Sequence, residues 1–295
     1  MEIEGVFFLT AGYGRRDEPL SLIHPKALLP YGETSILGRL ARQIRVLCPG
    51  IVRINASRCP EALLREISEV WQEEMCELYF EERPMGVSAT LARHTDTISS
   101  GTWMIVNTDM IIEDFDAIGM LEYHRKTESD WTALTGSFPR DGIYSPLFTD
   151  EYMKFGQGGT ERTHYWGISL MEPSIPAIAA RIQASEGLFS EIASEASVNG
   201  KRLITCRQDG RWLDMGRIDI LRRNILSGGS YVHPTACVSS DAVLEGSWNI
   251  GKSCILGSGA VLRNSVMLEG SSLESGTLEE CILPWFCSST DGGFV

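Results

Sequence analysis

Short apolar runs alternate with longer amphipathic segments between Val6 and Met171. We interpret the runs as strands, because β-branched and aromatic residues are frequent in them and turn residues bound them. These strands are expected at Val6–Leu9, Ile51–Asn55, Cys76–Phe80, Trp103–Asp109, Trp131–Thr135 and Tyr165–Met171.

The segments between these runs repeat apolar residues at the spacing of an α-helix. Residues 36–47 do so behind a Thr34-Ser35 cap, and Pro60 opens a second such segment. Further helices are expected at 115–126, 176–184 and 188–196, and a strand at 202–206. This alternation predicts an α/β fold built on a Rossmann-like, mostly parallel sheet.

The hydrophobic pattern changes to a hexapeptide repeat beyond Ser227. A small or apolar residue also follows four positions after each of the first six aliphatic residues of the repeat. This hexapeptide pattern is typical of a parallel β-helix, whose stacked coils point aliphatic side chains inwards. We therefore expect two domains, 1–228 and 229–295. The aliphatic positions are Val232, Val238, Leu244, Ile250, Leu256, Leu262 and Leu268.

Composition and net charge exclude some classes of function. The 295 residues carry a net charge of -13, which argues against a nucleic-acid surface. Every apolar run is far shorter than a membrane-spanning helix, so we expect no membrane segment. The eight cysteines form no CxxC pair, and we expect reduced thiols and a cytoplasmic protein.

The loop after the first strand carries the strongest chemical signal. Gly12-Tyr13-Gly14 is followed by a basic pair and then by Pro25-Lys26. A strand that opens into such a loop presents main-chain amides to phosphates. The loop is not a dinucleotide fingerprint, because Asp17 stands at the third glycine position. It is not a P-loop either, because no Gly-Lys-Ser/Thr follows.

The same loop resembles the signature of sugar-nucleotide pyrophosphorylases, the sugar-1-phosphate nucleotidyltransferases. That signature is approximately L-A-[AG]-G-x-G-T-R-[LM]-x-P-L-T, followed by P-K-x-L-[LV]-P. Twelve residues are in register with it: Leu9, Ala11, Gly12, Gly14, Arg16, Pro19, Leu20, Pro25, Lys26, Leu28, Leu29 and Pro30.

Three later segments are similar to the same family. The segment from Glu81 to His94 resembles the second nucleotide segment and contains Gly86. Asn107-Thr108-Asp109 resembles the V-x-N-G-D motif at a strand end. The last segment resembles W-x-D-[IV]-G-T-P and the asparagine that follows it, with Trp212, Asp214, Gly216 and Asn224 in place.

The resemblance implies that a sugar 1-phosphate attacks the α-phosphorus of an NTP, giving an NDP-sugar and pyrophosphate. The mannose-1-phosphate guanylyltransferase group is the best match, which implies GTP as the nucleotide. It also implies a left-handed β-helix tail and Mg²⁺ as the cofactor. A homo-oligomer formed through the tail is a possible assembly.

The resemblance also implies roles for individual residues. The proposed metal ligands are Asp109 and Asp214. The proposed catalytic cations are Arg16 and Lys26. The proposed nucleotide-binding residues are Ala11, Gly12, Gly14, Arg15, Gly86 and Asn107.

Departures from the family pattern leave alternatives open. Arg15 and Thr108 replace a threonine and a glycine, and no E-K-P motif follows Trp131. A catalytically inactive, nucleotide-sugar-binding regulatory homologue would suit these changes. An acyltransferase built on the β-helix is a further alternative, but it would need a catalytic histidine, and His233 has no partner motif.

Overall fold

The computed structural model describes residues 2–12, 18, 20–22, 24–139, 144–150, 154–155, 159–182 and 189–284. Its contacts divide the chain into two compact units. One comprises Met1–Tyr13 with Leu40–Trp212, and the other comprises Gly14–Arg39 with Leu213–Val295. The expected domain boundary at residue 228 stays a prediction.

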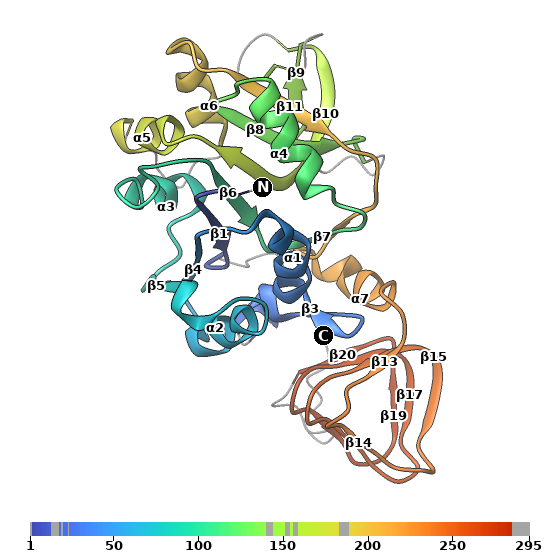
Figure 1. Ribbon diagram of the computed structural model, residues 1–295. Coiled ribbons are helices and arrows are strands. Elements are labelled where there is room, and N and C mark those ends of the chain that lie inside the picture. Colours follow the sequence, from blue (N-terminus) through green and yellow to red (C-terminus); the bar gives the residue numbers. More distant parts are fainter. Residues whose placement is uncertain are drawn as a thin grey trace. The chain divides into compact units, whose positions relative to one another are not determined.

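A sheet of eight strands forms the centre of the first unit (Figure 1). The strand order is β11-β8-β10-β6-β1-β4-β5, and β9 pairs with β10. The strands are β1 (Gly5–Leu9), β4 (Ile51–Ala56), β5 (Cys76–Phe80), β6 (Trp103–Asn107), β8 (Trp131–Gly136), β9 (Leu147–Thr149), β10 (Glu161–Met171) and β11 (Leu203–Arg207).

The sheet is mostly parallel, as the alternation of strands and helices predicted, with one exception. β10 runs antiparallel to β6, β8 and β9. The described residues between β8 and β10 contain no helix. A strand that returns without a crossover helix pairs antiparallel with its neighbour, which explains the direction of β10.

The helices are α1 (Ile36–Ile44), α2 (Pro60–Ser68), α3 (Val87–Arg93), α4 (Ala117–Lys126), α5 (Ser174–Arg181), α6 (Phe189–Val198) and α7 (Ile218–Leu226). Single 3-10 turns occur at Leu20–Leu22, Lys26–Leu28, Arg45–Leu47 and Glu73–Met75. The Gly38 N–H donates to Ser35 Oγ at 2.9 Å, so the predicted cap of the first helix is confirmed.

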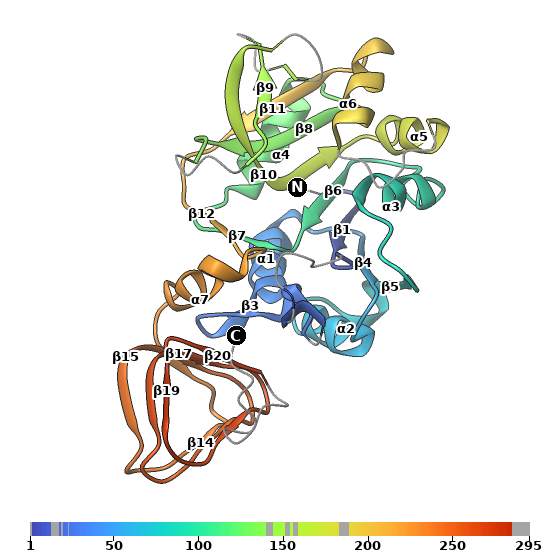
Figure 2. The same cartoon turned by 180° about the vertical axis from the view of Figure 1, so that it is seen from behind.

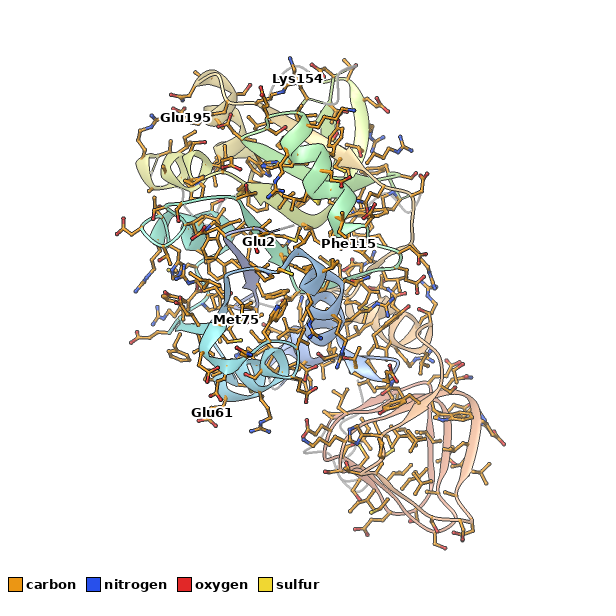
Figure 3. All side chains as sticks on the ribbon, viewed as in Figure 1. Glu2, Glu61, Met75, Phe115, Lys154 and Glu195 are labelled. Carbon is orange, nitrogen blue, oxygen red and sulfur yellow. The ribbon has the colours of Figure 1, made fainter. Side chains whose placement is uncertain are left out.

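Helices α3, α5 and α6 cover one face of the sheet (Figure 2). Side chains of alternate strand residues, such as Phe7, Trp103 and Trp131, meet them in a buried core. An ion pair between Arg181 and Glu195 joins α5 to α6 at the surface, where Figure 3 labels Glu195. Helices α2 and α4 contact the strands on the other face.

A buried cation lies on the face of the sheet that α3 covers. Arg53, in β4, is 3% exposed and pairs with Glu77 of the edge strand β5. Its guanidinium lies 4.9 Å from the centroid of the Tyr79 ring and 5.3 Å from that of Trp103. Stacking on aromatic faces and pairing with a carboxylate offset the cost of burying this cation.

His94 lies beside this cation, after the end of α3. Its ring packs edge-on against Phe7 at 5.2 Å and against Tyr79 at 4.4 Å. Burial, reinforced by the charges of Arg53 and Arg93, lowers the pKa of His94 to about 4. His94 is therefore neutral in the folded protein at neutral pH.

The second unit contains parallel ladders in two small sheets, ordered β13-β15-β17-β19 and β14-β16-β18, and β20 also pairs with β17. Figure 1 shows three-sided coils in this region, coloured orange to red. The strands are β13 (Tyr231–Val232), β14 (Cys237–Val238), β15 (Val243–Ile250), β16 (Ile255–Leu256), β17 (Val261–Met267), β18 (Ser272–Leu273), β19 (Thr277–Glu279) and β20 (Ile282–Leu283).

The ladder register follows the hexapeptide period through the first turn and then shortens. Leu244 pairs with Leu262, which lies three full repeats later, whereas Leu262 pairs with Leu278, which comes slightly before three further repeats are complete. Ile250 pairs with Met267, so Met267 takes the position that the strict period gives to Leu268. Leu268 is nevertheless buried.

Helix α7 lies against the coils within the same unit. The Arg222 guanidinium donates to the Asn264 carbonyl at 2.8 Å and pairs with Glu280 at 3.5 Å. The short strands β2 (Pro30–Tyr31) and β3 (Thr34–Ser35) form a hairpin whose Gly32 carbonyl accepts from Asn249 Nδ2 at 2.9 Å. Two further short strands of the chain are β7 (Met110–Ile112) and β12 (Trp212–Asp214).

The seven cysteines of the described residues are free thiols, of which Cys206 and Cys254 are buried and Cys48, Cys59 and Cys237 are exposed. Among the described residues, no helix combines the length and the apolar composition that a membrane crossing requires.

We predict that His94 makes stability depend on pH. Its pKa is about 4 in the folded protein and 6.5 in the unfolded chain, so the unfolded chain binds the proton more readily. The contribution is complete above pH 6.5 and is lost as the pH falls towards 4, by about 3 kcal/mol. Urea unfolding between pH 4 and 7 should give a smaller pH slope for His94→Gln than for the wild type. Equal slopes would refute the assignment.

Candidate functional site

The register of three parallel strands brings several predicted site residues to one edge of the sheet. Leu9, at the end of β1, pairs with Asn55 of β4 on one side and with Asn107 of β6 on the other. The chain segments that follow these residues therefore leave the sheet side by side. Ligands of open α/β sheets bind at this carboxyl edge.

Ala11 and Gly12 begin the loop that follows β1. Ala11 is buried, and its N–H donates to Asn55 Oδ1 at 3.3 Å. Gly12 is exposed, and no atom lies within 4 Å of the position that a Cβ would occupy. The proposed loop residues Gly14, Arg15 and Arg16 lie outside the described residues.

A buried polar network links this loop to the second nucleotide segment. Asn55 Nδ2 donates to Glu81 Oε1 at 2.8 Å, and both side chains are buried. Glu81 Oε1 also accepts from Thr90 Oγ1 at 3.1 Å, and Glu81 Oε2 accepts from the Met85 N–H at 3.2 Å. Our sequence interpretation did not assign a role to this network. Asn55, a polar residue next to the last position of the strand Ile51–Ala56, is the signal that it overlooked.

Gly86 precedes α3 and has φ 80° and ψ 160°. Only glycine adopts this region of the backbone map readily, so a side chain there would strain the turn. The sequence interpretation assigned Gly86 to nucleotide binding. The structure adds a conformational reason for the same residue.

Thr108 is the middle residue of the Asn107-Thr108-Asp109 motif, and its side chain points towards the sheet. Its hydroxyl donates to the Leu9 carbonyl at 2.9 Å, and the residue is 4% exposed. The threonine therefore caps the end of β1. A threonine therefore fits where the family pattern has glycine, because its side chain points towards the sheet.

Asn107 and Asp109 flank this cap. Asn107 Oδ1 is buried and has no hydrogen-bond partner among the described residues. Asp109 is half-buried and lies close enough to Tyr165 that burial and the Asp109 charge together raise the pKa of the Tyr165 hydroxyl. This hydroxyl bonds to Ser169 at 3.0 Å.

Gly167 lets β10 approach Asn107 closely. It has φ +86°, and a Cβ there would lie 3.2 Å from Asn107 Cβ and 3.0 Å from Met110 Cε. The register of β10 shifts between Tyr165 and Ser169, which places a bulge at this glycine. Bulges of this kind often redirect side chains beside functional sites.

Lys26 and Asp214 belong to the second unit. Lys26 begins a 3-10 turn directly after Pro25 and is half-exposed. Asp214 is 5% exposed, and its Oδ1 accepts from the Gly216 N–H at 2.8 Å. The Asp214 carbonyl accepts from Asn224 Nδ2 at 2.7 Å. Two other residues of the third motif thus hold Asp214 in place.

An aromatic cluster lies near the ends of β8 and β10. The His164 ring centroid is 4.3 Å from that of Trp212 and 5.0 Å from that of Tyr144. The indole nitrogens of Trp166 and Trp212 are buried without a hydrogen-bond partner among the described residues. The scattered aromatic residues did not predict this cluster, because the fold brings them together from distant segments.

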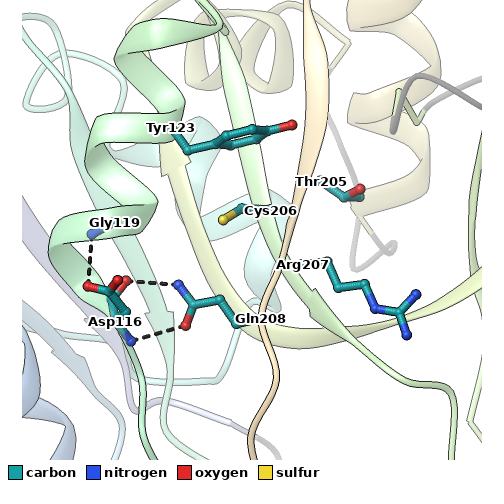
Figure 4. Close-up of a pocket in the computed structure, with 7 residues that line it drawn as sticks. All are labelled: Asp116, Gly119, Tyr123, Thr205, Cys206, Arg207 and Gln208. Atoms are coloured by element: carbon teal, nitrogen blue, oxygen red, sulfur yellow. Dashed lines mark hydrogen bonds between the residues drawn. The ribbon is translucent and has the colours of Figure 1, made fainter.

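A separate pocket of about 410 Å³ lies between α4 and β11 (Figure 4). Gln208 bridges the backbone of Asp116, accepting its N–H at 3.0 Å and donating to its carbonyl at 2.8 Å. Burial raises the pKa of the Cys206 thiol to about 11. No predicted site residue lines this pocket, and Asp116, Gly119 and Gln208 bind one another in its lining.

The chain is similar in sequence to curated guanylyltransferases, although no family model matches it. The mannose-1-phosphate guanylyltransferase of Mycobacterium tuberculosis is 23% identical, over 92% of this chain and 82% of its own length. The mannose-1-phosphate guanylyltransferase catalytic subunit beta of Danio rerio is 25% identical, over 97% of this chain and 87% of its own length.

Two solved structures share the fold. A Bacillus anthracis protein assigned as a glucose-1-phosphate thymidylyltransferase, in complex with sucrose, has a TM-score of 0.65 and 16% identity. The alignment covers 76% of this chain and 94% of the Bacillus anthracis chain. A UDP-glucose pyrophosphorylase complexed with UDP-glucose has a TM-score of 0.63 and 14% identity, over 76% of this chain and 98% of its own. At these identities the likeness is one of fold.

We predict that Thr108→Val lowers the free energy of unfolding by about 1 kcal/mol, because the Leu9 carbonyl loses its hydroxyl donor while the side-chain shape is kept. Urea unfolding measures the change. Thr160→Val, at an exposed threonine of the same unit, is the matched control and should change stability by less than about 0.5 kcal/mol. Equal effects at the two positions would contradict the capping role.

Proposed function

We propose that the protein transfers a nucleotidyl group from an NTP to a sugar 1-phosphate, producing an NDP-sugar and pyrophosphate. The observation that carries this proposal is the convergence of three motif segments at one carboxyl edge. The loop after β1, the turn at Gly86 and the Asn107–Asp109 segment are joined there by strand pairing and hydrogen bonds. The curated relatives and the shared fold support the same reaction.

This reaction must bring two anions together and allow pyrophosphate to leave in line. Positioning and charge neutralisation meet that demand, and no covalent intermediate is needed. In the proposal, main-chain groups at Ala11, Gly12, Gly14 and Gly86 bind the nucleotide, with Arg15 and Asn107 beside them. Arg16 neutralises charge on the reacting phosphates, and Lys26 binds the α-phosphate or the sugar phosphate.

Magnesium is the proposed cofactor, with Asp109 and Asp214 as its ligands. Carboxylate oxygens are the donors that this hard cation prefers, and one or two of them suffice when substrate phosphates and water complete the shell. The half-buried position of Asp109 at a strand end fits such a ligand. Among the described residues, no three acidic, histidine or cysteine side chains gather as a metal cluster. When bound, the ion would neutralise phosphate charge.

The proposed donor and acceptor are GTP and mannose 1-phosphate or a related sugar. The guanylyltransferase names of the sequence relatives support this choice. We place the reaction in the cytoplasm, where nucleotide and reduced thiols are both expected.

For residues 229–295 we propose a left-handed parallel β-helix that serves packing and association between copies. The parallel ladders, whose paired strands lie about three hexapeptides apart along the chain, support this reading. So does the inward aliphatic core, which includes Leu256, Leu262 and Leu273. The boundary at residue 228 belongs to the same proposal.

The activity test is a matrix of pyrophosphate release. Five NTPs are combined with glucose, mannose, N-acetylglucosamine, fucose and heptose 1-phosphates, with magnesium or with EDTA. We expect release with GTP and mannose 1-phosphate or a related sugar, and none with EDTA. Folded protein that releases pyrophosphate in no combination but binds a nucleotide sugar would contradict catalysis and support the regulatory alternative.

Asp109→Asn should lower kcat on the order of 100-fold or more, because an amide cannot replace the charge of a metal-binding carboxylate. Asp116→Asn is the matched control. Asp116 caps α4 by accepting the Gly119 N–H at 2.8 Å, and asparagine caps a helix equally well. It should retain wild-type activity. Full activity of Asp109→Asn would remove Asp109 from the proposed site.

A further inference from the structure

Asn55 is a buried amide with hydrogen bonds at both ends of its side chain. It is 3% exposed and directly precedes Ala56, the last residue of β4. None of the motif comparisons assigns it a role. We infer that Asn55 is a positioning residue for the nucleotide, an inference that rests on the proposed function.

The acceptor end of Asn55 fixes the start of the loop that follows β1. Its Oδ1 accepts the Thr10 N–H at 2.8 Å and the Ala11 N–H at 3.3 Å. The Thr10 hydroxyl also donates to the Asn55 carbonyl. Three contacts from one residue therefore set the direction in which the chain leaves β1 towards Gly12.

The donor end of Asn55 fixes the turn before α3 through Glu81. Asn55 Nδ2 donates to Glu81 Oε1, which Thr90 of α3 also contacts. The other carboxylate oxygen of Glu81 accepts from the N–H of Met85, the residue before Gly86. A continuous chain of hydrogen bonds thus joins the two loops that the proposed function assigns to the nucleotide.

The amide is needed because the two ends require opposite chemistry. The loop N–H groups need an acceptor, and the Glu81 carboxylate needs a donor. An aspartate at position 55 would keep the acceptor but face Glu81 with a second carboxylate. A displacement of about 1 Å between two substrate-binding loops is enough to reduce kcat/KM on the order of 100-fold, and a rise in KM for the NTP is part of that loss.

The test reverses donor and acceptor in the hydrogen bond between Asn55 and Glu81. Asn55→Asp should raise KM for the NTP about 10-fold or more, with a smaller effect on KM for the sugar 1-phosphate. Combining it with Glu81→Gln returns a donor and an acceptor to the pair in reversed order. The double variant should recover most of the lost NTP affinity, whereas Glu81→Gln alone should not improve on the wild type.

Matched controls separate positioning from loss of stability. Asn249→Asp changes another buried asparagine, which donates to the Gly32 carbonyl in the second unit. It should lower the melting temperature but leave KM for the NTP unchanged. Should Asn55→Asp not fold, Thr90→Val tests the same network, and it should raise KM for the NTP by a few-fold.

Two readouts keep this inference distinct from the proposed function. If the wild type releases no pyrophosphate with any substrate pair, the proposed function fails. Calorimetric titration of GTP into each variant then measures its dissociation constant, which tests the role of Asn55 in place of KM. If the wild type turns over but Asn55→Asp keeps the wild-type KM for the NTP, the inference alone is overturned. A double variant no better than Asn55→Asp would overturn it as well.

Discussion

The parallel pairing of β1 with β4 and β6 is the constraint on which the candidate site depends. A single register sets Leu9 between Asn55 and Asn107. Shifting that register by one residue would turn each strand face over and separate Thr108 from the Leu9 carbonyl. Side chains at the three strand ends then lock the loops to this edge, so that packing in the core determines geometry at the site.

The sequence predicted the elements of the sheet better than the contacts between them. Apolar runs such as Trp103–Asn107 correspond to strands because burial on both faces leaves a clear pattern. The direction of β10 was not predicted, since a local pattern does not reveal whether a crossover helix is present. The shift from Leu268 to Met267 in the coils has a similar cause: the repeat shortens there, and the hydrophobic pattern tolerates either residue.

For the candidate site, motif spacing predicted which residues to examine, and the structure shows how several of them are held. Ala11, Gly12, Gly86, Asn107 and Asp109 meet at the carboxyl edge of one sheet. Lys26 and Asp214 stand in the second unit, and Gly14, Arg15 and Arg16 lie outside the described residues. The supporting contacts were not predictable, because Asn55 and Glu81 are distant in the sequence and only pairing of β4 with β5 makes them neighbours.

Amide hydrogen exchange with and without nucleotide tests the central claim that this sheet edge binds an NTP. Each of five NTPs is added with magnesium, and exchange is followed by peptide. The account predicts that at least GTP slows exchange in residues 8–12, 82–90 and 105–110 and leaves residues 243–283 unchanged. Protection confined to α4 and β11, around the pocket of Figure 4, or no protection with any NTP, would contradict it.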